Sequence, residues 1–158
     1  MRYLCIAKNG AQLMFNIYVE RVIDKDINTV FELLADHAGY SQFNGVKVAK
    51  LLEPGDTEKN GLGALRHIDL GGVKFDERIT CFERPYRLDY KIEASSPLPF
   101  KHEIGCITLQ DIDGATKVIW ISKGCINVPI LGRFILDKFF ERKGNIGFAS
   151  LLKQMAKL

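Results

Sequence analysis

The sequence predicts an α+β domain in which a curved seven-stranded antiparallel sheet wraps around a long C-terminal helix. Three observations lead to this prediction. Apolar residues alternate with polar ones in seven short segments, turn-forming residues connect six of these segments in succession, and a long apolar-rich stretch follows the last one. The chain of 158 residues has the size of one domain with one core.

The chain is expected to open with a strand and a helix. Apolar residues at alternate positions, beginning with Phe15, predict a strand over residues 15–23. Asp24 or Asp26 is placed to cap the helix that follows, whose apolar residues repeat at helical spacing from Ile27 until residues 37–39 end the run. The aromatic and polar residues 40–44 are compatible with a short second helical turn.

Six further strands are predicted at 46–52, 62–70, 73–83, 88–95, 103–111 and 116–126. The connections are short, which makes successive strands antiparallel neighbours. Pro129 predicts the start of the final helix, which extends over residues 130–157. Gly144 and Gly147 either bend this helix or pack closely on the sheet. Because helix and sheet meet over a limited area, we expect a cavity at one end.

Composition and the N-terminal residues indicate a soluble protein of the cytoplasm. The apolar share of 47% and the charged share of 26% are ordinary, and no stretch approaches the roughly 20 apolar residues of a membrane span. Lys8, Asn9 and Gly10 interrupt the apolar start before a signal-peptide core forms. We expect residues 1–14 to be a poorly ordered extension, with Met1 and Met14 as alternative starts, and residues 15–158 to be a single domain.

The cysteines and the charges exclude several kinds of partner. The four cysteines are widely spread without paired spacing, so we expect them to be reduced and mostly buried, with no metal site. No glycine motif for a cofactor phosphate is present. The net charge is 22 minus 19, or +3, and the excess lies after Ile130, either as a solvated helix face or as a transient contact with a membrane surface. No stripe of basic and aromatic residues indicates nucleic-acid binding.

Gly71-Gly72 predicts a tight hairpin whose register places an ion pair inside the protein. Counting outward pairs Leu70 with Val73, Ile68 with Phe75, Arg66 with Glu77 and Ala64 with Ile79 on one face. The other face pairs Asp69 with Lys74 and His67 with Asp76. A slip of one residue would destroy both patterns. The buried pair either fixes the register or binds a ligand.

Asp113-Gly114 predicts a second hairpin, which pairs Val118 with Leu109, Trp120 with Ile107, Ser122 with Gly105 and Gly124 with Glu103. This register places Glu103 on the inner face and His102 on the outer face. Gly105 leaves volume unfilled opposite Ser122, which favours a cavity. Cys106, Ile119 and Ile121 form an apolar stripe on the outer face, explained either by a homodimer contact or by an error in this register. His37, at a helix end, is expected to make a capping or dipole contact.

The inner face is mostly apolar with a few polar groups, which is typical of a ligand pocket. The predicted ligand-binding residues are Arg66, Glu77, Phe75, Tyr90, Ile107, Trp120 and Ser122. The Arg66 guanidinium would bind a carboxylate, phenolate or carbonyl, with Glu77 orienting it or acting as a base. Because so close a pair keeps Glu77 ionised and weakly basic, anchoring is favoured over catalysis, and no catalytic residue is assigned.

The chain resembles the START-like (SRPBCC) superfamily of helix-grip proteins, and within it the bacterial polyketide cyclase/dehydrase and lipid-transport group. The resemblance covers residues 15–156 and is carried by residues 22–24, 30–36, Tyr40 with Phe43, 61–66, 77–80 leading to Pro85, 97–99 and 114–120. It implies binding or transport of a hydrophobic small molecule, such as a lipid, a quinone or a polyketide-like compound. The alternative is a cyclase, aromatase or dehydratase that uses the same pocket. A third class would bind membranes or partners through Tyr40, Phe43 and the basic terminal helix.

Overall fold

A computed structural model gives the fold, and it describes residues 15–128 and 135–158. Seven antiparallel strands form one sheet in the order β1-β7-β6-β5-β4-β3-β2. The strands are β1 (Phe15–Ile23), β2 (Val48–Glu53), β3 (Leu65–Asp69), β4 (Lys74–Glu83), β5 (Arg87–Ser96), β6 (Phe100–Ile112) and β7 (Ala115–Ile126). The helices are α1 (Ile27–Ala35), the short 3₁₀ helix η1 (Ala38–Gln42) and α2 (Asp137–Met155). The predicted fold class is confirmed, and each strand lies within three residues of its predicted bounds.

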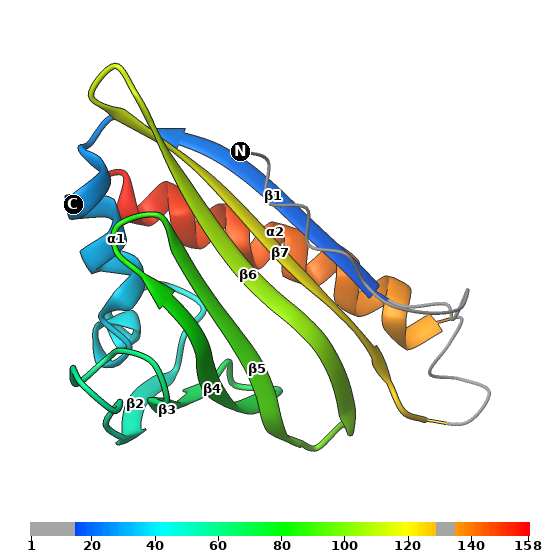
Figure 1. Cartoon of the computed structure of the whole chain (residues 1–158). Helices are drawn as coiled ribbons and strands as arrows, with labels where there is room; N and C mark the ends of the chain where they lie inside the picture. The colour runs from blue at the N-terminus through cyan, green and yellow to red at the C-terminus, as the bar shows by residue number, and fades with distance from the viewer. Residues whose placement is uncertain (1–14, 129–134) are drawn as a thin grey trace.

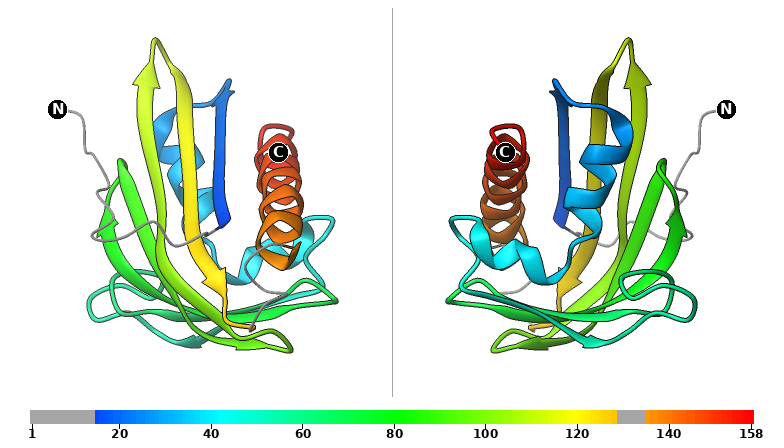
Figure 2. Two further views of the ribbon diagram at one scale, coloured as in Figure 1. Left: turned by 90° about the vertical axis from the view of Figure 1, so that its right-hand side faces the viewer. Right: turned by 90° about the vertical axis from the view of Figure 1, so that its left-hand side faces the viewer.

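The sheet curls around α2, which lies on its concave side (Figure 1). Figure 2 views α2 end-on and shows the strands bending beneath it from β7 toward β2. Asp26, one of the two predicted caps, accepts hydrogen bonds from the backbone N–H groups of Asn28 and Thr29 at the start of α1. The predicted extension over residues 1–14 and the predicted helix start at Pro129 lie outside the described residues.

Side chains of α2 bind the free edge of the sheet at β1. The backbone N–H of Asn16 donates to Glu141 Oε2 at 2.6 Å, and that of Tyr18 donates to Asn145 Oδ1 at 3.0 Å. An edge strand otherwise leaves such groups open to pairing with another chain. Gly144 lies between these contacts, where an added Cβ would come within 2.2 Å of Ile17 Cδ1. Close packing on the sheet therefore explains Gly144.

The first hairpin has the predicted register, with Arg66 opposite Glu77 and His67 opposite Asp76. The turn between β3 and β4 uses the conformational freedom of glycine, because Gly71 has a φ of 84°. His67 Nδ1 lies 2.6 Å from Asp76 Oδ1 on the outer face, as predicted. The sheet alternation thus separates the inner ion pair from the outer contact between His67 and Asp76.

The second hairpin follows the prediction from the turn to Gly105 and departs from it beyond that point. Ser122 pairs with Gly105, but a β-bulge between His102 and Ile104 makes Gly124 pair with His102 instead of Glu103. A bulge inserts one residue and exchanges the faces of the residues beyond it. The predicted positions were therefore wrong for both side chains: His102 is buried on the concave side, and Glu103 is exposed.

The outer apolar stripe is less exposed than predicted. Cys106 is only 2% exposed, and Ile119 and Ile121 are half-buried, although the register around them is the predicted one. Cys106 and Cys125 are buried, and Cys81 is half-buried. Within the described residues, none of the helices has the length and apolar character needed to span a membrane.

Candidate functional site

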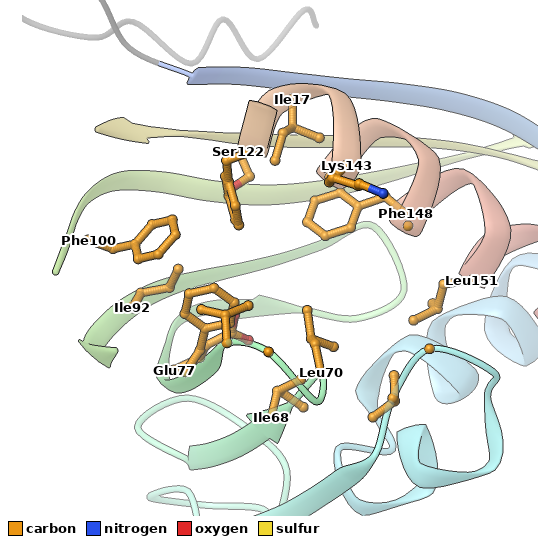
Figure 3. A pocket seen from close by; sticks show the side chains of 18 of the residues that line it. Ile17, Ile68, Leu70, Glu77, Ile92, Phe100, Ser122, Lys143, Phe148 and Leu151 are labelled. Atoms are coloured by element: carbon orange, nitrogen blue, oxygen red, sulfur yellow. The ribbon is translucent and has the colours of Figure 1, made fainter. Parts of the chain in front are cut away.

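A cavity of about 680 Å³ lies between the concave face of the sheet and α2. Its size falls within the usual range for sites that enclose small organic ligands. Most of its wall is apolar, with Ile17 from β1, Ile68 from β3, Ile92 from β5 and Phe148 from α2 (Figure 3). The polar side chains of the wall are Tyr40, Arg66, Glu77, Tyr90, Ser122 and Lys143.

Arg66 is the largest side chain that is fully buried in the described part of the chain, and it lies at the cavity wall. Its Nε donates to Glu77 Oε2 at 2.7 Å, and the two side chains are 2% and 10% exposed. The guanidinium carbon lies 5.3 Å from the ring centre of Tyr40 and 5.0 Å from that of Tyr90. Two aromatic faces therefore stabilise the cation in addition to the carboxylate.

His37 completes the surroundings of Arg66, which corrects the prediction of a capping contact. Its side chain is fully buried, and its Nδ1 accepts a hydrogen bond from the Arg66 guanidinium at 3.2 Å. Its Nε2 donates to the carbonyl oxygen of Asn60 at 2.8 Å. Burial, followed by the nearby charge of Arg66, lowers the pKa of His37 to about 3. His37 is therefore a neutral acceptor for Arg66.

The remaining groups around Arg66 also keep their ordinary protonation at neutral pH. Burial is the largest single effect on the pKa of Arg66 and acts to lower it, but the charge and hydrogen bond of Glu77 together with the two tyrosines outweigh burial, and the pKa is raised. Burial raises the pKa of Tyr40 and of Tyr90 above the usual value for a phenol. The tyrosines are neutral, and the ion pair is the charge system at this end of the cavity.

A second polar group lies on the strands next to the ion pair. The backbone N–H of Ile92 donates to His102 Nδ1 at 3.1 Å, so the ring proton of the neutral imidazole lies on Nε2. That Nε2 is 3.0 Å from Ser122 Oγ and donates to it. Burial, followed by the charge of Lys91, lowers the pKa of His102 to about 4, which is consistent with a neutral ring.

The hydroxyl of Tyr90 accepts a hydrogen bond from Trp120 Nε1 at 3.0 Å. The Tyr90 ring is stacked on His102 and lies across Gly105, where an added Cβ would come within 2.4 to 2.6 Å of ring atoms. The volume predicted to be empty at Gly105 is therefore filled by Tyr90. Because Gly105 pairs with Ser122, the Tyr90 ring and Ser122 lie at the same part of the sheet.

Six of the seven predicted ligand-binding residues line the cavity: Arg66, Phe75, Glu77, Tyr90, Trp120 and Ser122. Ile107 does not line it and is fully buried in the core opposite Trp120. The sequence predicted a cavity between the sheet and the C-terminal helix but named no residue of the helix wall, such as Phe148, which stacks on Trp120 at 4.2 Å. It also did not assign His37 or His102 to this site. The aromatic pair Tyr40 and Phe43 was visible in the sequence, but the position of Tyr40 beside Arg66 was not.

The described residues contain no group of three His, Cys, Asp or Glu side chains arranged to hold a metal ion. The chemistry available at the cavity wall is hydrogen bonding by hydroxyl, guanidinium and carboxylate groups. Nothing in this set pairs a neutral acid with an available base.

The gripped helix, the antiparallel sheet and the cavity between them define a START-like protein with the helix-grip fold. Residues 14–157 match the family described as polyketide cyclase/dehydrase and lipid transport, so the chain belongs to this family. The resemblance inferred from the sequence is confirmed. No protein of curated function matches the sequence.

Three solved structures illustrate how widely this fold is shared. A protein from Thermus thermophilus superposes with a TM-score of 0.74 at 18% identity, over 90% of this chain and 94% of that one. A START superfamily protein from Mycobacterium smegmatis gives 0.73 at 10% identity, with the same two coverages of 90% and 94%. The Zhui aromatase/cyclase from a Streptomyces species gives 0.70 at 18% identity, over 91% and 94%. At these identities the likeness establishes the fold alone.

Proposed function

We propose that this protein binds and carries a hydrophobic small molecule, such as a lipid, a quinone or a polyketide-like compound. The observation that carries the proposal is the cavity of about 680 Å³, whose apolar wall is interrupted by polar groups from a few adjacent strands. Burial of apolar ligand surface would supply the affinity, at roughly 25 cal/mol per Å² removed from water. The family description, which includes lipid transport, supports the same function.

The polar groups would set the orientation of the ligand. Arg66, Tyr90 and Ser122 present hydrogen-bond donors at one part of the wall, and Glu77 holds Arg66 in place. Phe75 and Trp120 would contact the apolar part of the ligand. Ligand pockets commonly combine an apolar lining with a small number of such fixed polar groups.

A cyclase or dehydratase is the second candidate function. It is favoured by the hydroxyls of Tyr90 and Ser122 beside the Arg66 cation, because such donors can stabilise an oxygen on which negative charge develops. Three arrangements make it the weaker candidate. Glu77 is bound by Arg66, His37 is held between Arg66 and Asn60, and His102 carries its proton toward Ser122 and so cannot remove one from it. A β-hydroxy ketone probe that loses water to give the enone in the presence of the protein would establish this activity.

We also propose a transient contact with an anionic membrane surface beside the cavity. Phe139 and Lys143 line the cavity and are exposed, and Lys138 and Arg142 are exposed on the same helix. Exposed apolar and cationic side chains together favour an anionic lipid interface. Vesicles containing an anionic phospholipid should sediment the protein at low salt and release it at high salt; no sedimentation at low salt would exclude the contact.

Trp120 gives a direct test of the carrier function, because it is the only tryptophan in the chain and lines the cavity. Titration with N-phenyl-1-naphthylamine, a neutral apolar fluorophore, should quench Trp120 emission by energy transfer and saturate at one molecule per chain. Ile68→Phe, which projects into the cavity, should weaken binding, whereas Leu52→Phe at an exposed position of the neighbouring strand should not. Absence of saturable quenching would refute the proposal.

A further inference from the structure

The charge balance of the cavity wall limits which ligands can enter. The Arg66 cation is already paired with the Glu77 carboxylate at 2.7 Å, and its guanidinium donates a second hydrogen bond to His37. Glu77 itself lines the cavity. A ligand carboxylate beside them would bring a second negative charge next to Glu77. The other cation of the described cavity wall, Lys143, is exposed on α2 and forms no ion pair with Glu77. An uncompensated buried charge costs several kcal/mol.

The second polar group offers a donor to a neutral oxygen. Tyr90 and Ser122 have one hydroxyl proton each. Trp120 Nε1 donates to Tyr90, and His102 Nε2 donates to Ser122, so neither of these contacts consumes a hydroxyl proton. Each hydroxyl therefore keeps an O–H that can be donated to a ligand. Both residues line the cavity.

From these two observations we propose that the cavity selects neutral hydrophobic molecules that carry a carbonyl oxygen, which accepts a hydrogen bond from the hydroxyl pair of Tyr90 and Ser122. The corresponding carboxylates are discriminated against. This inference rests on the proposed carrier function. Of the three ligand groups expected from the sequence, a carboxylate, a phenolate and a carbonyl, it keeps only the uncharged carbonyl.

His102 acts in this arrangement as a positioning residue. Its Nδ1 is occupied by the backbone N–H of Ile92, and its Nε2 proton fills one acceptor position of Ser122. Ser122 and His102 resemble a nucleophile beside a base, but here the imidazole donates the hydrogen bond and the hydroxyl accepts it. The imidazole therefore fixes Ser122 as a donor toward its other neighbours and does not activate it for attack.

The test measures how three competitors displace N-phenyl-1-naphthylamine at pH 8. Tridecan-2-one and dodecanoate share the same undecyl tail and differ by a methyl group in place of a charged oxygen, and tridecane lacks oxygen altogether. We expect the ketone to bind at least about tenfold more tightly than dodecanoate, because only the carboxylate brings a second negative charge beside Glu77.

Substitutions then show whether the hydroxyl pair is responsible. Ser122→Ala should weaken binding of the ketone by about three- to tenfold, the range for one lost hydrogen bond. The affinity for tridecane should stay within about twofold of the wild-type value. Ser150→Ala, at an exposed position of α2, is the matched control and should change neither. If Ser122→Ala does not fold, Tyr90→Phe serves as a second variant, which should likewise weaken binding of the ketone and not of tridecane. His102→Phe should lose the preference for the ketone over tridecane. His102→Gln, whose amide N–H can still donate to Ser122, should keep this preference.

The outcomes separate this inference from the function on which it rests. Binding of dodecanoate as tightly as the ketone, or equal weakening of ketone and tridecane by Ser122→Ala and Tyr90→Phe, would overturn the inference while the carrier function stands. Failure of the fluorophore and all three competitors to bind the wild-type protein would overturn both.

Discussion

Nε of Arg66 donates to Oε2 of Glu77 across 2.7 Å on the concave face of the β3–β4 hairpin. On the next rung of the same ladder, His67 and Asp76 make a contact of 2.6 Å on the outer face. The inner pair is buried, and both members of the outer pair are partly exposed. One hairpin therefore offers two neighbouring side-chain contacts to a carboxylate in opposite surroundings.

Glu77→Gln should destabilise the protein by about 3 to 5 kcal/mol, because it leaves the buried Arg66 cation without its carboxylate. Asp76→Asn on the outer face should cost less than about 1 kcal/mol, as for other exposed pairs. The measurement is the free energy of unfolding in urea at pH 7.5. Equal losses for the two variants would show that the inner pair is not desolvated as described.

Stability should fall as the pH is lowered from 7.5 to 5.5. The pKa of His37 is about 3 and that of His102 about 4 in the folded protein, below the usual 6.5. In this window the unfolded chain takes up protons at these two residues and the folded protein does not, so acidification favours unfolding. At pH 5.5, each histidine should lower the free energy of unfolding by about 1.4 kcal/mol. His102→Gln should reduce this pH dependence; an unchanged slope in urea unfolding would contradict the neutral state of His102.

Two glycines of α2 should respond in opposite directions to the same substitution. An added methyl at Gly144 would overlap Ile17, which is 1% exposed, whereas at Gly147 it would meet nothing within 4 Å. Gly147→Ala should raise the free energy of unfolding by about 0.5 to 1 kcal/mol, because alanine favours the helix. Gly144→Ala should lower it by about 1 to 3 kcal/mol through overpacking. Thermal unfolding with the same sign for both variants would contradict the packing of α2 on β1.

Gly105→Ala should displace the ring of Tyr90 and weaken ligand binding. The new methyl would lie within 2.6 Å of ring atoms, so the hydroxyl of Tyr90 would move away from Trp120. The emission of Trp120 should shift, and the affinity for tridecan-2-one should fall. Ser150→Ala, at an exposed position of α2 that does not line the cavity, is the control and should leave both unchanged. Unaltered emission in Gly105→Ala would show that Tyr90 does not depend on this glycine.

The sheet and the inner ion pair could be predicted because local chemistry determines them. Gly71-Gly72 and Asp113-Gly114 each fix a tight turn, and each turn fixes a register that the alternation of apolar residues then supports. Arg66 and Glu77 follow directly from the first register. Asp113 and Gly114 both adopt positive φ, as the second turn requires.

The rest of the site could not be predicted because it depends on departures from regular pairing and on tertiary packing. The bulge that brings His102 to Ser122 on the concave side has no signature in the residues around it, and every face assignment beyond it changes. His37 is held beside Arg66 by a second hydrogen bond, in which its other ring nitrogen donates to the carbonyl oxygen of Asn60. Phe148 lines the cavity because of the way α2 is oriented about its own axis, and the packing of Gly144 on Ile17 sets that orientation.

Native mass spectrometry of the purified protein tests the central claim most directly, which is that the cavity holds a hydrophobic small molecule. The account predicts a mass above that of the chain, which falls to the bare chain on denaturation and releases an uncharged, oxygen-bearing lipophile. A wild-type protein with the bare mass that also remains bare after incubation with tridecan-2-one would contradict it.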